Sequence, residues 1–417
     1  MNGTTQRRRF PGTNGKRIQP QCEVLETRLA LSSLTLNGSM FSVTSNGSSP
    51  QIAKDSSGDY VVTYDDGNGN VYVQGYSSSN STQFSAFAVT SGGDTPSVAM
   101  DANGHFIVAW HTTSGDNLDA QEFNFSDGSS VASAFQVNTT PSSYVTPVVL
   151  SVLRSPKVAM DPAGDFVFTW GRNNTLDLGV WGRLYNSQGQ AVTGEFLVDD
   201  TNSDCGKPWV AMDSSGNFTI SYGVGGESQQ QIGEYDVYFQ RYNSSGQAQG
   251  SKTFVAKSTD AQDSNRGPAI AMDSSGDFVI TWADSLTEDA IYAQVFNSDG
   301  TAKTSIITVA DFGANSNDGR APYSPAVTMD ASGDWVVTWS FGSLFDVYAR
   351  GYSLDGTALS DAVQVSFQNP FNHSEHLYSS VAIDSSGDVT VVWVDTGSQN
   401  WGVSGAVNAQ NLTLSTT

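Results

Sequence analysis

The sequence has almost no cysteine and no long hydrophobic run, and these absences exclude several classes of protein. Only Cys22 and Cys205 occur among the 417 residues, so disulfides cannot form the scaffold and a hydrophobic core must stabilise the fold. No stretch approaches the roughly 20 consecutive apolar residues that a membrane-spanning helix requires. We therefore expect a protein that folds around its own core and has no membrane span.

Positive charge is also scarce and unevenly placed. The chain has 19 Lys and Arg against 42 Asp and Glu, for a net charge of -23. Residues 1–33 hold six basic and two acidic side chains, which leaves 13 basic and 40 acidic ones in residues 34–417. Because nucleic acids and anionic lipids are bound by clusters of Lys and Arg, we expect neither as a partner. We expect an acidic monomer.

Histidine is the third shortage, and it bears on catalysis and on metal binding. Of the four histidines, only His373 and His376 lie close together in the sequence. Since a zinc site needs three or four ligands, this pair is a weak metal candidate. No residues show the pattern of a nucleophile with its base. The sequence therefore predicts no catalytic residue.

What the sequence does contain is one block repeated seven times. In each copy an Asp is followed three residues later by Gly and nine residues later by an aromatic residue. The seven sets are Asp55/Gly58/Tyr64, Asp101/Gly104/Trp110, Asp161/Gly164/Trp170, Asp213/Gly216/Tyr222, Asp273/Gly276/Trp282, Asp330/Gly333/Trp339 and Asp384/Gly387/Trp393. Because the spacings are constant, we interpret each block as one structural unit.

The chemistry of the block predicts a β-hairpin. The Asp can accept N–H bonds from the turn, and the Gly can adopt the left-handed conformation that a short hairpin loop needs. The run after the turn, as in residues 278–282, is apolar at nearly every position, which is typical of a strand buried on both faces. Residues 291–296 and 307–309 illustrate the third and fourth strands that follow. Four strands per repeat of this length indicate a β-propeller.

Ring closure follows from counting strands. The last repeat has a third strand at about residues 403–407 and then little chain, while Phe41 and Val43 lie in an unassigned strand before the first repeat. We predict an all-β fold, a seven-bladed β-propeller of four-stranded blades closed by this N-terminal strand. Leu412 and Leu414 are the alternative closing strand. An open array of β-sandwich modules is the rival fold, but each module would need more strands.

The domain organisation follows from the same repeats. Residues 1–36 are assigned to a basic, disordered leader for export, and residues 37–417 to the propeller. The repeats are placed near 48–93, 94–152, 153–204, 205–264, 265–320, 321–376 and 377–417.

Two stretches resemble known bacterial families. Residues 25–32, which read LETRLALS, resemble the LExRxLLS export signature of planctomycete proteins and depart from it at Ala30. The repeats resemble those of large secreted and surface proteins, of the form PxVAxDxxGxFVVxW, VYAQxFNxxG and FQV. The first resemblance implies export, and the second implies a noncatalytic secreted or cell-surface protein with no catalytic residues to carry over.

The connections between strands indicate where a ligand would bind. Those between the second and third strands and between repeats vary in length, and variable loops on a rigid scaffold usually carry binding. We predict that a ligand binds on this variable face, near the ring axis. The candidates are Asp66, Asp116, Glu234, Asp289, Phe345, Asp346 and Trp401. Aromatic rings beside carboxylates suit carbohydrate, although solvated loops would have the same composition.

Calcium is the one cofactor that the sequence leaves open. Asp65, Asp66 and Asn68 have the composition of a calcium loop, but a Gly/Asn hairpin explains them equally well. We predict a noncatalytic extracellular or cell-surface propeller that binds carbohydrate, matrix or protein in adhesion. The alternatives are a secreted polysaccharide hydrolase or lyase, and a purely structural, calcium-stabilised surface module.

Overall fold

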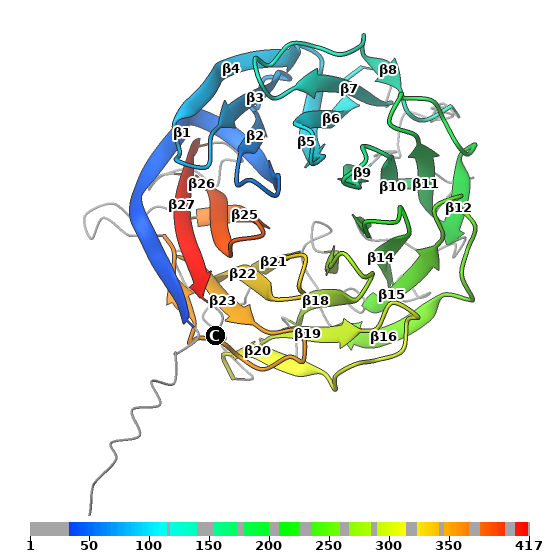
Figure 1. The fold of residues 1–417 in the computed structure, drawn as a ribbon, viewed down its shortest axis with the longest axis vertical. Coiled ribbons are helices and arrows are strands. Elements are labelled where there is room, and N and C mark those ends of the chain that lie inside the picture. The colour runs from blue at the N-terminus through cyan, green and yellow to red at the C-terminus, as the bar shows by residue number, and fades with distance from the viewer. Residues whose placement is uncertain are drawn as a thin grey trace, which may run out of the picture.

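The fold is a ring of β-sheets (Figure 1). The computed structural model describes residues 33–114, 117–139, 154–172, 179–199, 208–225, 235–258, 267–284, 290–313, 323–341, 346–366, 376–396 and 405–415. All the regular elements in these ranges are strands. Within them, no helix has the length and apolar character needed to cross a membrane.

Five sheets in the described ranges have four antiparallel strands each, with the first strand near the centre of the ring and the fourth at its rim (Figure 1). The first sheet contains β5 (Gly93–Met100), β6 (His105–Thr112), β7 (Leu118–Asn124) and β8 (Phe135–Gln136), and the second contains β9 (Arg154–Met160), β10 (Phe166–Arg172), β11 (Gly179–Tyr185) and β12 (Phe196–Asp199). The third contains β13 (Trp209–Met212), β14 (Phe218–Gly225), β15 (Tyr235–Tyr242) and β16 (Thr253–Ser258), and the fourth contains β17 (Ala269–Met272), β18 (Phe278–Asp284), β19 (Ala290–Phe296) and β20 (Ile307–Asp311). The fifth contains β21 (Tyr323–Met329), β22 (Trp335–Phe341), β23 (Asp346–Tyr352) and β24 (Val363–Gln364).

The sixth sheet has seven strands and joins the two ends of the chain. Its order is β25 (His376–Ile383), β26 (Asp388–Asp395), β27 (Gly405–Ser415), β1 (Ser33–Lys54), β2 (Tyr60–Asp65), β3 (Val71–Tyr76) and β4 (Thr82–Thr90). The first half of β1 pairs with β27, where Leu34 lies opposite Leu414, and its second half pairs with β2, where Ile52 lies opposite Val62. We call the junction of β25–β27 with β1–β4 the seam.

The propeller prediction is confirmed, and the β-sandwich array is wrong. The expected strands at residues 291–296 and 307–309 are β19 and β20. The expected third strand at 403–407 was too short, because β27 continues to Ser415 with Leu412 and Leu414 buried between β26 and β1. These two leucines therefore belong to β27 itself. Strand β1 also starts earlier than the expected strand around Phe41, at Ser33, since Leu34 packs in the same apolar cluster as Leu412.

The Asp turns have the predicted geometry. In the β17–β18 turn, Oδ1 of Asp273 accepts N–H bonds from Ser275 and Asp277 at 2.8 and 3.0 Å, and Gly276 has a φ of +87°. The same pair of bonds to residues two and four positions on recurs at Asp55, Asp101, Asp161, Asp213, Asp330 and Asp384. These carboxylates hold the hairpins together.

The core lies between neighbouring sheets. Strand β18 is buried at all seven positions, as expected for a strand covered on both faces. Val279 of this strand shares a cluster with Trp335 and Trp339 of the next sheet. Each sheet thus buries one face against the sheet before it and the other face against the sheet after it. This packing holds the short turns in place at one end of the ring.

Candidate functional site

The two ends of the ring carry different connections. We call the end with the first-to-second and third-to-fourth strand turns the short-turn face, and the other end the variable face. On the variable face, the β2–β3 and β4–β5 connections are described in full, whereas most others fall outside the described residues. The predicted residues Asp116, Glu234, Asp289, Phe345, Trp401 and His373 lie outside the described residues.

Asp65, Asp66 and Asn68 lie together in the β2–β3 connection, where hydrogen bonds within the protein occupy the carboxylates. Asp65 is 4% exposed, and its Oδ1 accepts bonds from the Ser48 hydroxyl and the Gly67 N–H. Oδ1 of Asp66 accepts the N–H of Asn68 at 2.9 Å, and its Oδ2 accepts the Asn70 amide at 2.7 Å. Although desolvation acts in the opposite direction, these bonds hold the pKa of Asp66 below its ordinary value. The geometry is that of a Gly/Asn hairpin.

The other two predicted residues within the described ranges begin strands. Asp346 is half-buried and lies opposite Phe341 at the start of β23, and His376 starts β25 opposite Asp395. Neither residue is adjacent in the sheets to Asp65 or Asp66. Among the described residues, no group of three or more His, Cys, Asp or Glu side chains could hold a metal ion.

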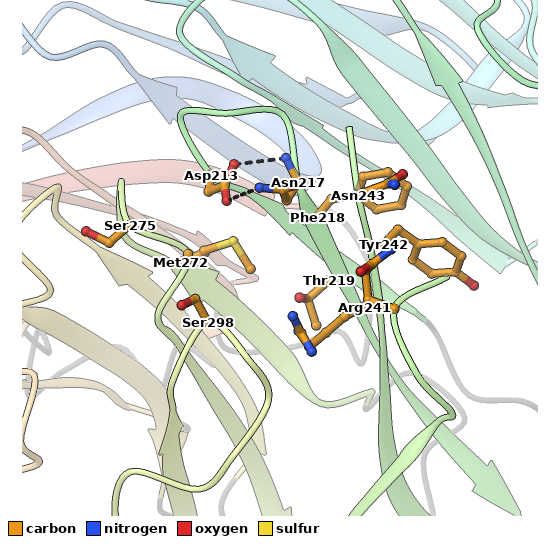
Figure 2. Close-up of a pocket in the computed structure, with 12 residues that line it drawn as sticks. Asp213, Asn217, Phe218, Thr219, Arg241, Tyr242, Asn243, Met272, Ser275 and Ser298 are labelled. Atoms are coloured by element: carbon orange, nitrogen blue, oxygen red, sulfur yellow. Dashed lines mark hydrogen bonds between the residues drawn. The ribbon is translucent and has the colours of Figure 1, made fainter. Parts of the chain in front are cut away.

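A cavity of about 260 Å³, which we call the groove, opens on the short-turn face between the β13–β16 sheet and the β17–β20 sheet (Figure 2). Polar side chains from the turns and strands of both sheets line it. They include Asp213, Asn217, Arg241, Asn243, Ser275 and Ser298. Phe218 and Tyr242, whose ring centroids are 4.9 Å apart, are buried beside it. The volume is close to the lower end of the range for small-molecule sites, about 300–1,000 Å³.

Arg241 bridges the two sheets. It projects from β15 toward the middle of the groove (Figure 2), and its Nη1 donates to the carbonyl oxygen of Asp299 in the β19–β20 turn at 2.5 Å. A Cβ atom on Gly300 would lie 3.0 Å from the Arg241 Cδ, and Gly300 has a φ of +85°. Glycine at this turn therefore leaves the room in which the arginine side chain lies.

Hydrogen-bonding groups make up most of the polar lining of the groove. The one carboxyl group among the described lining residues, Asp213, accepts N–H bonds from Ser215 and Asn217 on Oδ1 and the Asn217 amide on Oδ2, all at 2.8 to 2.9 Å. Burial, with a contribution from nearby Asp199, raises the pKa of the Tyr242 phenol further above the neutral range. The groove thus presents a guanidinium, amides and hydroxyls, which are hydrogen-bonding groups for a polar ligand.

The sequence holds a signal for the groove that the prediction missed. Arg241 directly precedes the aromatic residue that ends the third strand. At the equivalent position of the two neighbouring sheets stand Leu184 and Val295, which are 1% and 0% exposed. Arg241 is thus a charged side chain at a position where the two neighbouring sheets have a buried aliphatic one. This difference marks the place where a cavity lies between two sheets.

Comparison with known proteins shows the fold alone. The sequence matches no known family profile and no characterised protein. The polysaccharide lyase Uly1 superposes with a TM-score of 0.52 at 10% identity, over 89% of this chain and 91% of that one. A protein of unknown function from Dyadobacter fermentans gives 0.49 at 9% identity, over 92% of this chain and 99% of that one. An α-L-arabinanase from Penicillium chrysogenum gives 0.46 at 11% identity, over 76% and 92%.

Proposed function

We propose that this chain is a noncatalytic propeller that binds carbohydrate in cavities between its sheets. The observation that carries the proposal is the groove, where Arg241 and the polar turn residues of two sheets face one space (Figure 2). Sugar hydroxyls both donate and accept hydrogen bonds, and amides, hydroxyls and a guanidinium supply complementary partners. A surface or matrix polysaccharide is therefore the ligand class that suits the groove best.

The alternative of a hydrolase has less support in the groove. Glycoside hydrolysis uses two carboxyl groups about 5–9.5 Å apart. Among the described residues, Asp213 is the single carboxyl group lining the groove, and hydrogen bonds occupy both of its oxygens. The shared fold of the polysaccharide lyase does not add a catalytic residue to this chain.

The same proposal includes the number of blades and the closure of the ring. The seven-stranded sheet is interpreted as two four-stranded blades that share β1, one at each half of that strand. Together with the five four-stranded sheets this gives seven blades closed by an N-terminal strand, in line with the seven Asp turns. A rigid closed ring would keep both walls of each cavity in place.

The proposed setting is outside the cell. The likeness of residues 25–32 to an export signature and of the repeats to those of bacterial surface proteins supports it. The variable face, with Asp66 in the β2–β3 connection and Asp346 at the start of β23, remains a second predicted contact surface.

A glycan-binding experiment tests the proposal. Wild-type protein is applied to an array of neutral and acidic polysaccharides and oligosaccharides, and affinities for the hits are measured by calorimetry. Arg241→Ala should weaken binding at the groove about 10-fold, the loss expected for one or two charged hydrogen bonds. Lys257→Ala, which removes an exposed positive charge on β16, is the control and should leave the affinity unchanged.

Two results would contradict the proposal. Wild-type protein that binds no glycan would remove the function altogether. Steady release of shortened chains or unsaturated products from a bound polysaccharide would show that the protein is a hydrolase or lyase instead.

A further inference from the structure

A second cavity lies at the seam. It has a volume of about 380 Å³, and we call it the seam cavity. The first half of β1, with Asn411 of β27, forms one wall, and β3 with the β3–β4 turn and the start of β4 forms the other. The lining residues are Asn37, Gly38, Ser39, Phe41, Ser42, Gln74, Tyr76, Asn80, Thr82 and Asn411.

A β-bulge opens the cavity. The pairing of β1 with β27 passes from Asn37 opposite Asn411 to Phe41 opposite Ala409, so three residues of β1 face one residue of β27. Such a bulge redirects side chains away from the regular ladder. Gln410 lies at the bulge, where its Nε2 donates to the Gly38 carbonyl at 3.2 Å and its buried Oε1 has no hydrogen-bond partner among the described residues. At the bulge, one buried side-chain acceptor of the seam is thus left without a partner among the described residues, and Gly38 and Ser39 of the bulge line the cavity.

A second departure from the repeat adds a side chain to the wall. Asn80 has a φ of +63° at the turn position that holds Gly189, Gly246 and Gly300 in other sheets. Asparagine tolerates this conformation better than most residues. Its Oδ1 accepts the Tyr60 hydroxyl at 2.9 Å, which fixes the amide beside the cavity. The seam thus has an amide where the regular turns have no side chain.

Among the described residues, no charged side chain lines the seam cavity, and those that do line it suit one class of ligand. Four amides and the three hydroxyls of Ser39, Ser42 and Thr82 offer donors and acceptors, while the rings of Phe41 and Tyr76, with centroids 5.7 Å apart, offer apolar surface. A phosphate or a carboxylate would need a cationic partner. A neutral sugar has hydroxyls that match the amides and C–H faces that pack against aromatic rings.

We infer that the seam cavity is a binding site for an uncharged glycosyl residue, separate from the groove. This inference rests on the proposed carbohydrate binding and adds a site and a sugar class to it. The strands that line the seam cavity, β1, β3, β4 and β27, lie across the ring from β14 and β15, which line the groove (Figure 1). A polysaccharide that reaches both sites would gain avidity without any new contact.

The test uses the full chain and a panel of neutral oligosaccharides, with affinities measured by calorimetry. The first variant is Asn80→Gly with Thr82→Ala, which restores the regular turn glycine and removes two exposed lining groups. The second is Asn37→Ala on the opposite wall. Gln188→Ala, in the equivalent turn of the β9–β12 sheet, is the matched control, and Arg241→Ala in the groove is a second control. Melting temperatures check that all five proteins are folded.

The inference predicts that the first variant loses about 10-fold in affinity for the neutral sugar and the second about 3-fold, while Gln188→Ala and Arg241→Ala retain it. If wild-type protein binds neutral glycans and both seam variants bind equally well, the seam site is wrong and the proposed function stands. If wild-type protein binds no glycan of any kind, both are wrong.

Discussion

The seam and the regular boundaries between sheets bring together equivalent strands, but the side chains that make the contacts differ. At five boundaries the residue before the turn Asp is methionine, namely Met100, Met160, Met212, Met272 and Met329. At the seam it is Lys54, whose ammonium lies 3.4 Å from Asp384 Oδ2 and donates to the Asp388 carbonyl at 2.9 Å. Both charged side chains are at most 5% exposed. The seam therefore adds a buried ion pair where the regular boundaries have apolar contact.

This difference teaches how the two ends of one chain are joined. A regular boundary is supported by continuous chain from one sheet to the next, whereas the seam joins residues more than 300 positions apart. It uses the pairing of β1 with β27, the Lys54–Asp384 pair and a bond from the Ser385 hydroxyl to the Ser56 carbonyl. Most predictions below disturb one of these contacts and compare it with its regular counterpart.

The largest effect is expected from deleting residues 33–44. The deletion would expose β27, including Val407, Ala409 and Leu412, all 0% exposed, and would leave an open strand edge. We expect insoluble protein or loss of the cooperative melting transition. Removal of residues 1–32 is the control and should leave the melting temperature unchanged. A soluble, cooperatively folded protein lacking 33–44 would contradict the role of β1.

The next effect concerns Lys54. Lys54→Ala leaves Asp384 buried without its cation, and we expect a loss of about 2–3 kcal/mol in the free energy of unfolding, because two N–H bonds to Asp384 remain. Lys54→Met restores the residue of the regular boundaries and should cost less than Lys54→Ala. Urea unfolding of the three proteins measures both differences. If Lys54→Ala and Lys54→Met lost equal free energies of unfolding, the charge of Lys54 and not the packing of its side chain would account for its contribution to the stability of the seam.

The sequence predicts the structure of the regular sheets better than it predicts the structure of the seam. The Asp273 turn and strands β18 and β19 follow from side-chain chemistry that is local, so the repeat predicts them. The long β1 does not follow, because Gly38 and Ser39 interrupt its apolar pattern at the bulge. The seam cavity joins Asn37, Asn80 and Asn411, and only the folded ring brings these distant residues together.

The groove was missed for a related reason. The sequence pattern predicts binding in the variable loops, whereas Arg241 lies in a regular strand. Its difference from Leu184 and Val295 is visible only when the repeats are compared position by position. On the variable face, Asp65 and Asp66 lie in the β2–β3 connection, where their carboxylates accept hydrogen bonds from the hairpin itself.

Alkaline pH should destabilise both regions. Burial raises the pKa of Tyr76 at the seam and of Tyr185 in the β9–β12 sheet to about 12, from an ordinary value of 10.0. The folded state holds these protons more tightly than the unfolded state, so the contribution is fully present below pH 10 and is lost as the pH rises toward 12. Melting temperatures measured between pH 8 and 12 should fall above pH 10. Tyr76→Phe and Tyr185→Phe should each reduce the fall, and an unchanged slope in both would contradict the cause.

The smallest effect compares two serines. Ser385 donates to the Ser56 carbonyl across the seam, and Ser274 donates to the Ala331 carbonyl across a regular boundary, both at 2.8 Å and both exposed. Ser385→Ala and Ser274→Ala should each cost about 0.5–1 kcal/mol. Chemical denaturation of the two variants tests this. If Ser385→Ala lost much more free energy of unfolding than Ser274→Ala, the Ser385–Ser56 bond would contribute more to the stability of the seam than we expect beside the Lys54–Asp384 ion pair.

The most direct test of the account is a crystal structure of the protein with an oligosaccharide that it binds. The account predicts an intact sugar in the groove beside Arg241 or in the seam cavity between Phe41 and Asn80. A cleaved product, or a sugar bound only at the variable face, would contradict it.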